Sequence, residues 1–194
     1  MNSIKAKRFT NWPQAILGVT FNWGKFFKSL TFSYFIIHLL FPNQYTGVLL
    51  GWSGVICSSS EVQSLNLLAF LPAFVLYTGC INWTLFYDTI YAFQDKEHDE
   101  KMGLKSTAIL LQKNPTLWLL GFSTLCSSNL ALFGWLTSQE PIYYITVGAA
   151  MLHFLKQIIM VDYKSPKSCM SQFKSNTAIG YLVAFGLLAS IYIK

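Results

Sequence analysis

Five of the eight acidic residues lie in one stretch, residues 87–108, directly after a long apolar run. If a helix continues through this stretch, Asp88, Asp95 and Asp99 follow one another at spacings of seven and four positions. At about 100° per residue, the three carboxylates then lie within about 40° of one another on one helix face. Carboxylates grouped at a membrane interface suit a hard divalent cation, and Mg²⁺ typically takes one or two of them with water and phosphate oxygens. The spacing therefore predicts a magnesium–diphosphate site.

The same stretch contains a cation and two hydroxyl groups after the aspartates. Lys105, with Ser106 and Thr107 beside it, could contact phosphate oxygens. A different interpretation is a solvated, charged connector with helical ion pairs such as Glu97 with Lys101. The position of the first aspartate favours the functional interpretation, because an acid directly past an apolar span lies at a depth where charge is costly and usually functional.

The composition shows what surrounds these carboxylates. Of the 194 residues, 53% are hydrophobic and 11% are charged, whereas a soluble domain has about 25% charged residues. Since the apolar residues occur in long runs, the sequence predicts an all-α, multi-span helical membrane protein. The net charge of +6 is attributed to lysines that face an anionic membrane surface, and nucleic-acid binding is excluded.

Four uncharged apolar stretches have about the length that a bilayer requires. They are residues 65–87, 116–136, 142–160 and 177–193. A fifth span results if residues 25–47 are set aside, because residues 12–24 and 48–57 then join into 23 uncharged residues, about 34 Å of helix. The sequence thus predicts about five transmembrane helices.

Basic residues are concentrated in alternate connections between these spans. Ten of the fourteen are Lys5, Lys7, Arg8, Lys96, Lys101, Lys105, Lys113, Lys164, Lys167 and Lys174. The intervening connections contain only Glu61 and Glu140 as charged residues. A Lys/Arg bias of this kind orients spans, so the N-terminus and the connections 94–113 and 162–174 are expected on one side of the membrane.

Residues 87–108 resemble the second aspartate-rich motif of the UbiA superfamily of intramembrane aromatic prenyltransferases, closest to its 4-hydroxybenzoate polyprenyltransferase branch. The resemblance extends upstream through residues 7–14, 17–24 and 49–53, and downstream through Asp162, Pro166, Cys169, Phe173, Asn176 and Gly180. It covers nearly the whole chain apart from residues 25–47. It implies that residues 1–194 form a single, partial UbiA-like transmembrane domain, equivalent to helices five to nine of a nine-helix bundle.

The resemblance also implies a reaction and a set of site residues. In such enzymes the aspartates of two motifs hold Mg²⁺ on the diphosphate of a polyprenyl donor, and the allylic cation formed on ionisation alkylates the ring of 4-hydroxybenzoate during ubiquinone biosynthesis. By carry-over, Asp95 and Asp99 would be the magnesium ligands, Asp88 a supporting acid and Lys105 a diphosphate contact. His98 departs from the family, which commonly has an acidic residue there. Its alternative interpretation is a solvated loop histidine.

Two further features depart from the family pattern. The first aspartate-rich motif, of the form N-D-x-x-D-x-x-x-D, has no counterpart, since the first acidic residue is Glu61. We therefore expect an alternative or misassigned start, and a chain that is inactive by itself. Residues 25–47 interrupt an expected helix, and the glycines at both ends, Gly24 and Gly47, fit a retained intron. A genuine re-entrant or interfacial insertion is the alternative.

Other classes of function remain open at this point. One is a non-catalytic membrane subunit or a scaffold that binds a divalent cation; another is a gene-model fragment. An intron implies a eukaryote, which predicts the mitochondrial inner membrane, with a bacterial plasma membrane as the alternative. The expected partners are polyprenyl diphosphate, 4-hydroxybenzoate, the lipid bilayer and other proteins of ubiquinone biosynthesis.

Several aromatic side chains could line a chamber for the prenyl tail and shield the allylic cation. They are Trp12, Phe21, Trp23, Trp52, Trp83 and Tyr91. For most of them, packing within the bundle or against lipid is the alternative interpretation.

Overall fold

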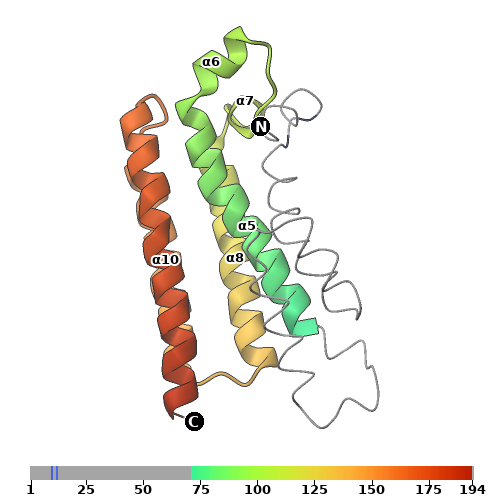
Figure 1. Cartoon of the computed structure of the whole chain (residues 1–194), viewed down its shortest axis with the longest axis vertical. Helices are drawn as coiled ribbons and strands as arrows, with labels where there is room; N and C mark the ends of the chain where they lie inside the picture. Colours follow the sequence, from blue (N-terminus) through green and yellow to red (C-terminus); the bar gives the residue numbers. More distant parts are fainter. Residues whose placement is uncertain (1–9, 11, 13–70, 194) are drawn as a thin grey trace, which may run out of the picture.

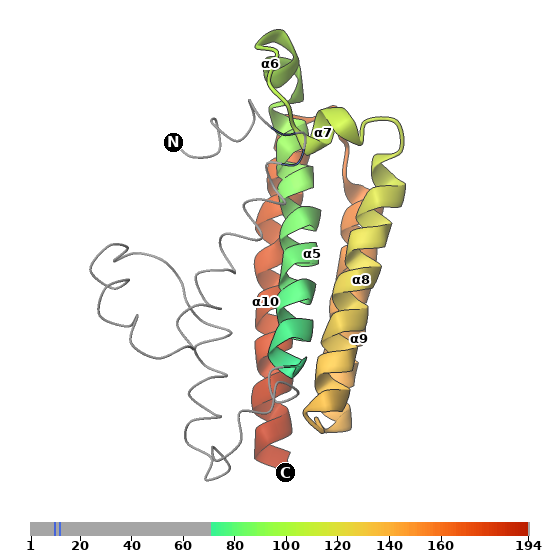
Figure 2. The same ribbon diagram turned by 90° about the vertical axis from the view of Figure 1, so that its right-hand side faces the viewer.

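The structure, a computed structural model, describes residues 10, 12 and 71–193. Its helices are α5 (Leu71–Gln94), α6 (Lys96–Lys101), α7 (Thr107–Leu110), α8 (Pro115–Leu136), α9 (Pro141–Met160) and α10 (Pro166–Ile193). The long helices α5, α8, α9 and α10 run side by side, and the short helices α6 and α7 lie together at one end (Figures 1 and 2). The predicted all-α fold is confirmed for this part of the chain. The fifth span and the insert at 25–47 lie outside the described residues.

Two of the long helices begin and end close to their predicted positions. Helices α8 and α9 each have proline in the first turn, which needs no backbone N–H donor there, and each starts one residue before the predicted span. The other two helices are longer than predicted. Helix α5 continues seven residues past position 87, and α10 begins eleven residues before position 177.

The long helices pack as a four-helix bundle. Helix α5 contacts α8 and α10, and α9 contacts the same two helices (Figure 2). Helices α5 and α9, which lie on one diagonal of the bundle, are joined by Phe86 and Phe154. Both rings are buried, and their centroids lie 4.6 Å apart in an edge-to-face arrangement. This aromatic pair fills the centre of the bundle.

The end of the bundle at the α8–α9 turn is closed by polar contacts to backbone atoms. Ser190, in the last turn of α10, accepts a hydrogen bond from the backbone N–H of Glu140 at 2.8 Å. The buried Tyr143 hydroxyl donates to the carbonyl oxygen of Leu130 at 2.9 Å. The first bond fixes the turn against α10, and the second joins α9 to α8.

At the opposite end, the α9–α10 connection packs against α5 and α8. The ring of Tyr163 lies 4.9 Å from that of Phe93, and its hydroxyl is 3.3 Å from Thr116 Oγ1. Burial raises the pKa of the Tyr163 hydroxyl, which the hydrogen bond to Thr116 opposes, so this tyrosine stays protonated at neutral pH.

The outer surface of the bundle is strongly apolar. Helices α8, α9 and α10 are long and apolar enough to cross a membrane. The described residues of α5 do not combine the length and hydropathy that a membrane span requires. Large apolar side chains point outward from these helices, including Leu117, Trp135, Ile145, Leu152, Ile159, Phe185 and Leu188. An apolar surface of this extent fits lipid rather than water. The predicted membrane protein is thereby confirmed, and the count of five spans stays a prediction.

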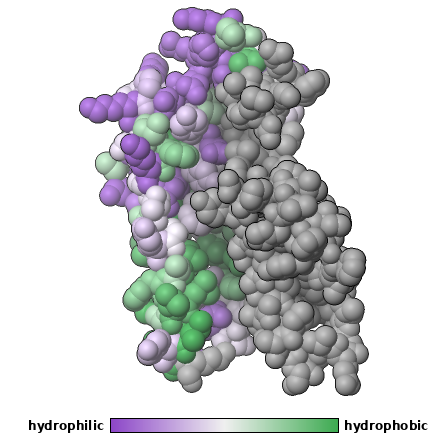
Figure 3. Space-filling model, viewed as in Figure 1, coloured by the Kyte–Doolittle hydropathy of each residue, from purple (hydrophilic) through white to green (hydrophobic). Residues whose placement is uncertain are grey.

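Two exposed tryptophans indicate how the bundle lies in the bilayer. Trp118 and Trp135 of α8 are 17 residues apart, which corresponds to about 26 Å along the helix. This separation is close to the thickness of the hydrocarbon core, and tryptophan is enriched at both of its interfaces. On the face shown in Figure 3, hydrophilic residues gather at the α6 end and hydrophobic residues cover the opposite part.

Candidate metal–diphosphate site

The helix expected to run through all three aspartates is interrupted at Asp95. Helix α5 ends at Gln94, Asp95 lies in a turn, and α6 begins at Lys96. Aspartate is a weak helix former that favours caps and turns, which agrees with its place between the two helices. The prediction of one continuous helix face carrying Asp88, Asp95 and Asp99 is therefore wrong.

Two of the three carboxylates nevertheless stay together. The backbone N–H of Asp99 donates to the carbonyl oxygen of Asp95 at 2.9 Å, which places the two residues one helical turn apart. Side chains at this spacing are neighbours on a helix surface. Asp99 is only 2% exposed, so its side chain points toward the body of the protein rather than into solvent.

Asp88 lies within α5, below the turn at Asp95. Its Oδ2 atom is buried and has no hydrogen-bond partner within the described part of the chain. A buried carboxylate oxygen without a donor is costly, and it is a natural ligand for a cation or for a donor outside the protein.

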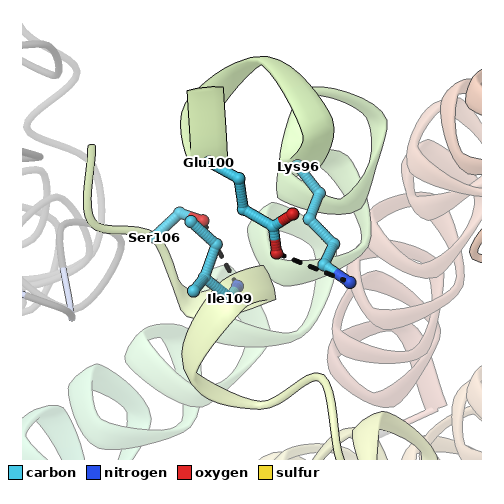
Figure 4. Close-up of polar contacts among 4 residues, drawn as sticks. All are labelled: Lys96, Glu100, Ser106 and Ile109. Atoms are coloured by element: carbon cyan, nitrogen blue, oxygen red, sulfur yellow. Dashed lines mark hydrogen bonds and ion pairs between the residues drawn. The ribbon is translucent and has the colours of Figure 1, made fainter. Parts of the chain in front are cut away.

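Lys105 lies in the segment after α6, between a turn at Gly103 and the hydrogen-bonded residues Ser106 and Thr107. Gly103 has a positive φ of 63°, a conformation that glycine adopts without strain, and it turns the chain back toward α5. Ser106 then caps α7 by accepting a hydrogen bond from the backbone N–H of Ile109 at 3.4 Å (Figure 4). Thr107 Oγ1 accepts a hydrogen bond from Thr89 Oγ1 of α5 at 3.3 Å.

These anchors change the roles expected of the hydroxyl groups. Ser106 and Thr107 are buried and already hydrogen-bonded, so they serve the local fold rather than phosphate binding. Lys105, in contrast, is exposed and forms no ion pair with any described residue. It is the cation of this segment that remains available to a phosphate.

The charged residues around these groups are mostly solvated. Lys96 and Glu100 form an ion pair with an N–O distance of 3.8 Å, one helical turn apart (Figure 4). This is not the Glu97–Lys101 pair that the connector interpretation predicts. Glu97 and His98 are exposed. An ion pair on the surface, such as Lys96 with Glu100, contributes little to stability.

The residues fit a metal that is held jointly with a substrate, rather than by protein alone. Among the described residues, no group of three acidic, histidine or cysteine side chains could hold a metal ion. Mg²⁺ on a diphosphate needs only one or two carboxylates from the protein. The neighbouring Asp95 and Asp99, with the unpartnered oxygen of Asp88 on the adjoining helix, meet that smaller requirement.

The described aromatic residues pack between elements. Trp83 donates a hydrogen bond to Asn176 Oδ1 of α10 at 3.3 Å, and the rings of Tyr91 and Phe173 lie 5.1 Å apart. Trp12 packs edge-on against Trp118, with centroids 6.1 Å apart. These contacts favour the packing interpretation for Trp12, Trp83 and Tyr91. Phe21, Trp23 and Trp52 lie outside the described residues.

A polar seam between α9 and α10 was not expected from the sequence. Gln157 Nε2 donates to the carbonyl oxygen of Gln172 at 3.1 Å and also to Ser175 Oγ, and His153 Nε2 lies 3.2 Å from the same Oγ. The signal was present in the sequence, since His153 and Gln157 are one helical turn apart within an otherwise apolar span.

Comparison with known proteins identifies the family. The UbiA prenyltransferase family matches residues 2–186. The chain belongs to this family. A Drosophila melanogaster member named "4-hydroxybenzoate polyprenyltransferase, mitochondrial" is 35% identical over 188 residues, which is 97% of this chain and 40% of that protein. Members with the same name from Mus musculus and Caenorhabditis elegans are 38% and 34% identical, over 94% and 97% of this chain.

The match to these UbiA relatives covers only part of their length. This chain spans 40% of the Drosophila and mouse proteins and 44% of the nematode protein. No solved structure matches the chain.

Proposed function

We propose that this chain supplies one side of the active site of an aromatic prenyltransferase. The reaction is transfer of a polyprenyl group from polyprenyl diphosphate to the ring of 4-hydroxybenzoate, a step of ubiquinone biosynthesis. The observation that carries the proposal is the similarity to relatives named for this activity over almost the entire chain. The position of Asp95, Asp99 and Lys105 in and beside α6, at one end of the bundle, supports it.

Each site residue has a role in binding the diphosphate. Asp95 and Asp99, one helical turn apart, would hold Mg²⁺ from one side, with Asp88 as a supporting acid. Mg²⁺, when bound, would neutralise the charge that develops on the leaving diphosphate. Lys105 would donate charge-assisted hydrogen bonds to phosphate oxygens. As the bond from the prenyl carbon to the diphosphate oxygen breaks, a carbon–carbon bond to the ring forms, and the ring then loses one proton.

This chain contains the carboxylates Asp95 and Asp99 for one side of the diphosphate. No acidic residue precedes Glu61, and we propose that the carboxylates opposite Asp95 and Asp99 belong to a segment outside this sequence. We propose that the chain is active only when joined to such a segment.

A chimera tests the reaction. The matching part of the mouse relative is replaced by this chain, without residues 25–47, and membranes are supplied with polyprenyl diphosphate and radiolabelled 4-hydroxybenzoate. We expect a lipid-soluble labelled product that requires Mg²⁺ and disappears with a chelator. A scaffold or non-catalytic subunit would bind the metal without consuming the donor, and that result would reject the proposal.

We also propose that the protein resides in the mitochondrial inner membrane, because the relatives are named mitochondrial and the bundle is apolar on its outside. Fractionation of mitochondria followed by carbonate extraction checks this location. Recovery in the soluble fraction, or in another membrane, would contradict it.

Residues 25–47 are, in our proposal, an insert rather than part of the family domain. Removing them restores an uncharged stretch long enough to span a bilayer. Transcript reads across this region decide between the two interpretations: most mature messages should lack these codons. Uniform read coverage, together with peptides from the segment, would establish a genuine insertion.

A further inference from the structure

The polar seam fixes how α9 and α10 face each other. Gln157 of α9 donates a hydrogen bond to Ser175 of α10, so these two residues lie on the line of contact between the helices. On one side of that line, Asn176 accepts a hydrogen bond from Trp83, and Phe154 packs against Phe86. Both partners belong to α5, so this side of the seam faces the interior of the bundle.

Two lysines lie on the other side of the same line. Lys156 directly precedes Gln157, and Lys174 directly precedes Ser175. In two antiparallel right-handed helices, the residues that precede a facing pair lie on the same side of the contact line, about 100° away from it. Since Asn176, which follows Ser175, faces inward, both lysines face outward. Both are exposed, as this geometry requires.

The positive charge of this pair is not neutralised by the described part of the protein. Neither Lys156 nor Lys174 forms an ion pair with a described residue. No acidic residue is present in α9 or α10. The two ammonium groups therefore form a local cationic site.

The surroundings of the pair are apolar and outward-facing. Lys156 lies four residues before the last residue of α9, which is about 6 Å along the helix axis. Lys174 lies eight residues after the first residue of α10, about 12 Å along its axis. Exposed apolar side chains continue from the lysines along both helices: Leu152 and Ile159 on α9, and Tyr181 and Phe185 on α10. Lysine side chains at such depths extend along the helix to reach the interface.

The seam itself contains an acceptor that the described protein does not use. Gln157 is 1% exposed, and its Oε1 atom has no hydrogen-bond partner among the described residues. Its Nε2 group already donates to Ser175 and Gln172, so the side chain is held in place. A buried acceptor of this kind can be satisfied by an ordered water molecule.

We propose that the α9–α10 outer surface, formed by Lys156, Lys174 and the apolar side chains beside them, binds an anionic phospholipid. Its phosphate lies between the two ammonium groups, and its acyl chains lie along the apolar side chains. A lipid is the proposed occupant rather than free phosphate, because exposed apolar side chains, which would contact acyl chains, lie on the same surface as the two cations. Basic sites between transmembrane helices are suited to such headgroups.

Native mass spectrometry of the detergent-purified chain tests this inference. The probes are phosphatidylglycerol and phosphatidylcholine with identical acyl chains. We expect retained adducts of phosphatidylglycerol in excess over phosphatidylcholine. The double variant Lys156→Gln/Lys174→Gln should lower this preference by about fivefold per lysine. The variant Lys156→Arg/Lys174→Arg should keep it, because the charge is retained.

The matched control is Lys101→Gln/Lys113→Gln, which removes the same charge from exposed residues that belong to neither α9 nor α10. It should preserve most of the preference for phosphatidylglycerol. Equal retention of both lipids by the unmodified chain would overturn the inference, as would an equal loss in the control. Displacement of phosphatidylglycerol by an equal concentration of inorganic phosphate would show that the site binds phosphate rather than lipid.

Discussion

Gly186 of α10 packs directly against Thr146 of α9. A Cβ atom on Gly186 would overlap Thr146 Oγ1 and lie 3.0 Å from its Cβ. Thr146 is held there, because its hydroxyl donates a hydrogen bond to the carbonyl oxygen of Tyr143 at 2.7 Å. The two helices thus approach closely at this point, as small residues permit between helices in a membrane.

Gly186→Ala should destabilise the bundle by about 1–3 kcal/mol, because the added methyl group forces α9 and α10 apart. Unfolding in mixed micelles with increasing SDS measures this loss. The matched control is Gly148→Ala in α9, where an added Cβ meets nothing within 4 Å and should change little. Equal stability of the two variants would show that the close packing is not important.

The helix ends show where sequence patterns succeed and where they do not. The apolar runs 116–136 and 142–160 matched α8 and α9 to within one residue, and the residue that each run omitted is the proline at which the helix begins. Helix α10 begins earlier than predicted because its polar first turns are stabilised by partners on other helices, such as Asn176 with Trp83. Contacts between elements far apart in the sequence are not visible in a hydropathy pattern.

The candidate site was predictable in part, for similar reasons. The one-turn relation of Asp95 and Asp99 follows from their spacing and is observed. The break at Asp95, which separates them from the helix that carries Asp88, was not expected, because most residues around it are acceptable in helices. Ser106 and Thr107 had suitable chemistry for phosphate, but only the fold shows that they are used by the backbone of α7 and by Thr89.

The topology prediction can be tested by labelling single introduced cysteines. Lys105→Cys and Lys164→Cys should react with an impermeant maleimide from one side of the membrane, and Ser138→Cys, in the α8–α9 turn, from the other. The reason is the bias of basic residues toward alternate connections. The unsubstituted chain gives the background from native cysteines. Reaction of positions 105 and 138 from the same side would reject the proposed orientation.

Asp88→Asn should leave the stability of the bundle unchanged or raise it by up to about 1 kcal/mol, since burying an unpaired charge costs more than burying a neutral amide. The same change should lower prenyl transfer by the chimera. Thermal unfolding in detergent measures the first effect, and the radiolabel assay measures the second. The exposed Glu97→Gln serves as the control and should affect neither quantity. A clear loss of stability in Asp88→Asn would assign this carboxylate a structural role instead.

The catalytic assignment makes the most specific prediction. In the chimera, Asp95→Asn or Asp99→Asn should reduce turnover to background, because either change removes a carboxylate that holds the metal and so leaves the diphosphate poorly oriented and its charge uncompensated. Orientation and electrostatic stabilisation together contribute many kcal/mol to such reactions, so a loss of at least about 100-fold is expected. Glu100→Gln is the matched control: Glu100 follows Asp99 in the same helix, is exposed, and its carboxylate forms an ion pair with Lys96. It should retain most of the activity. An unimpaired Asp95→Asn variant, or substantial activity of the 194-residue chain by itself, would show that the roles given to Asp95 and Asp99 are wrong.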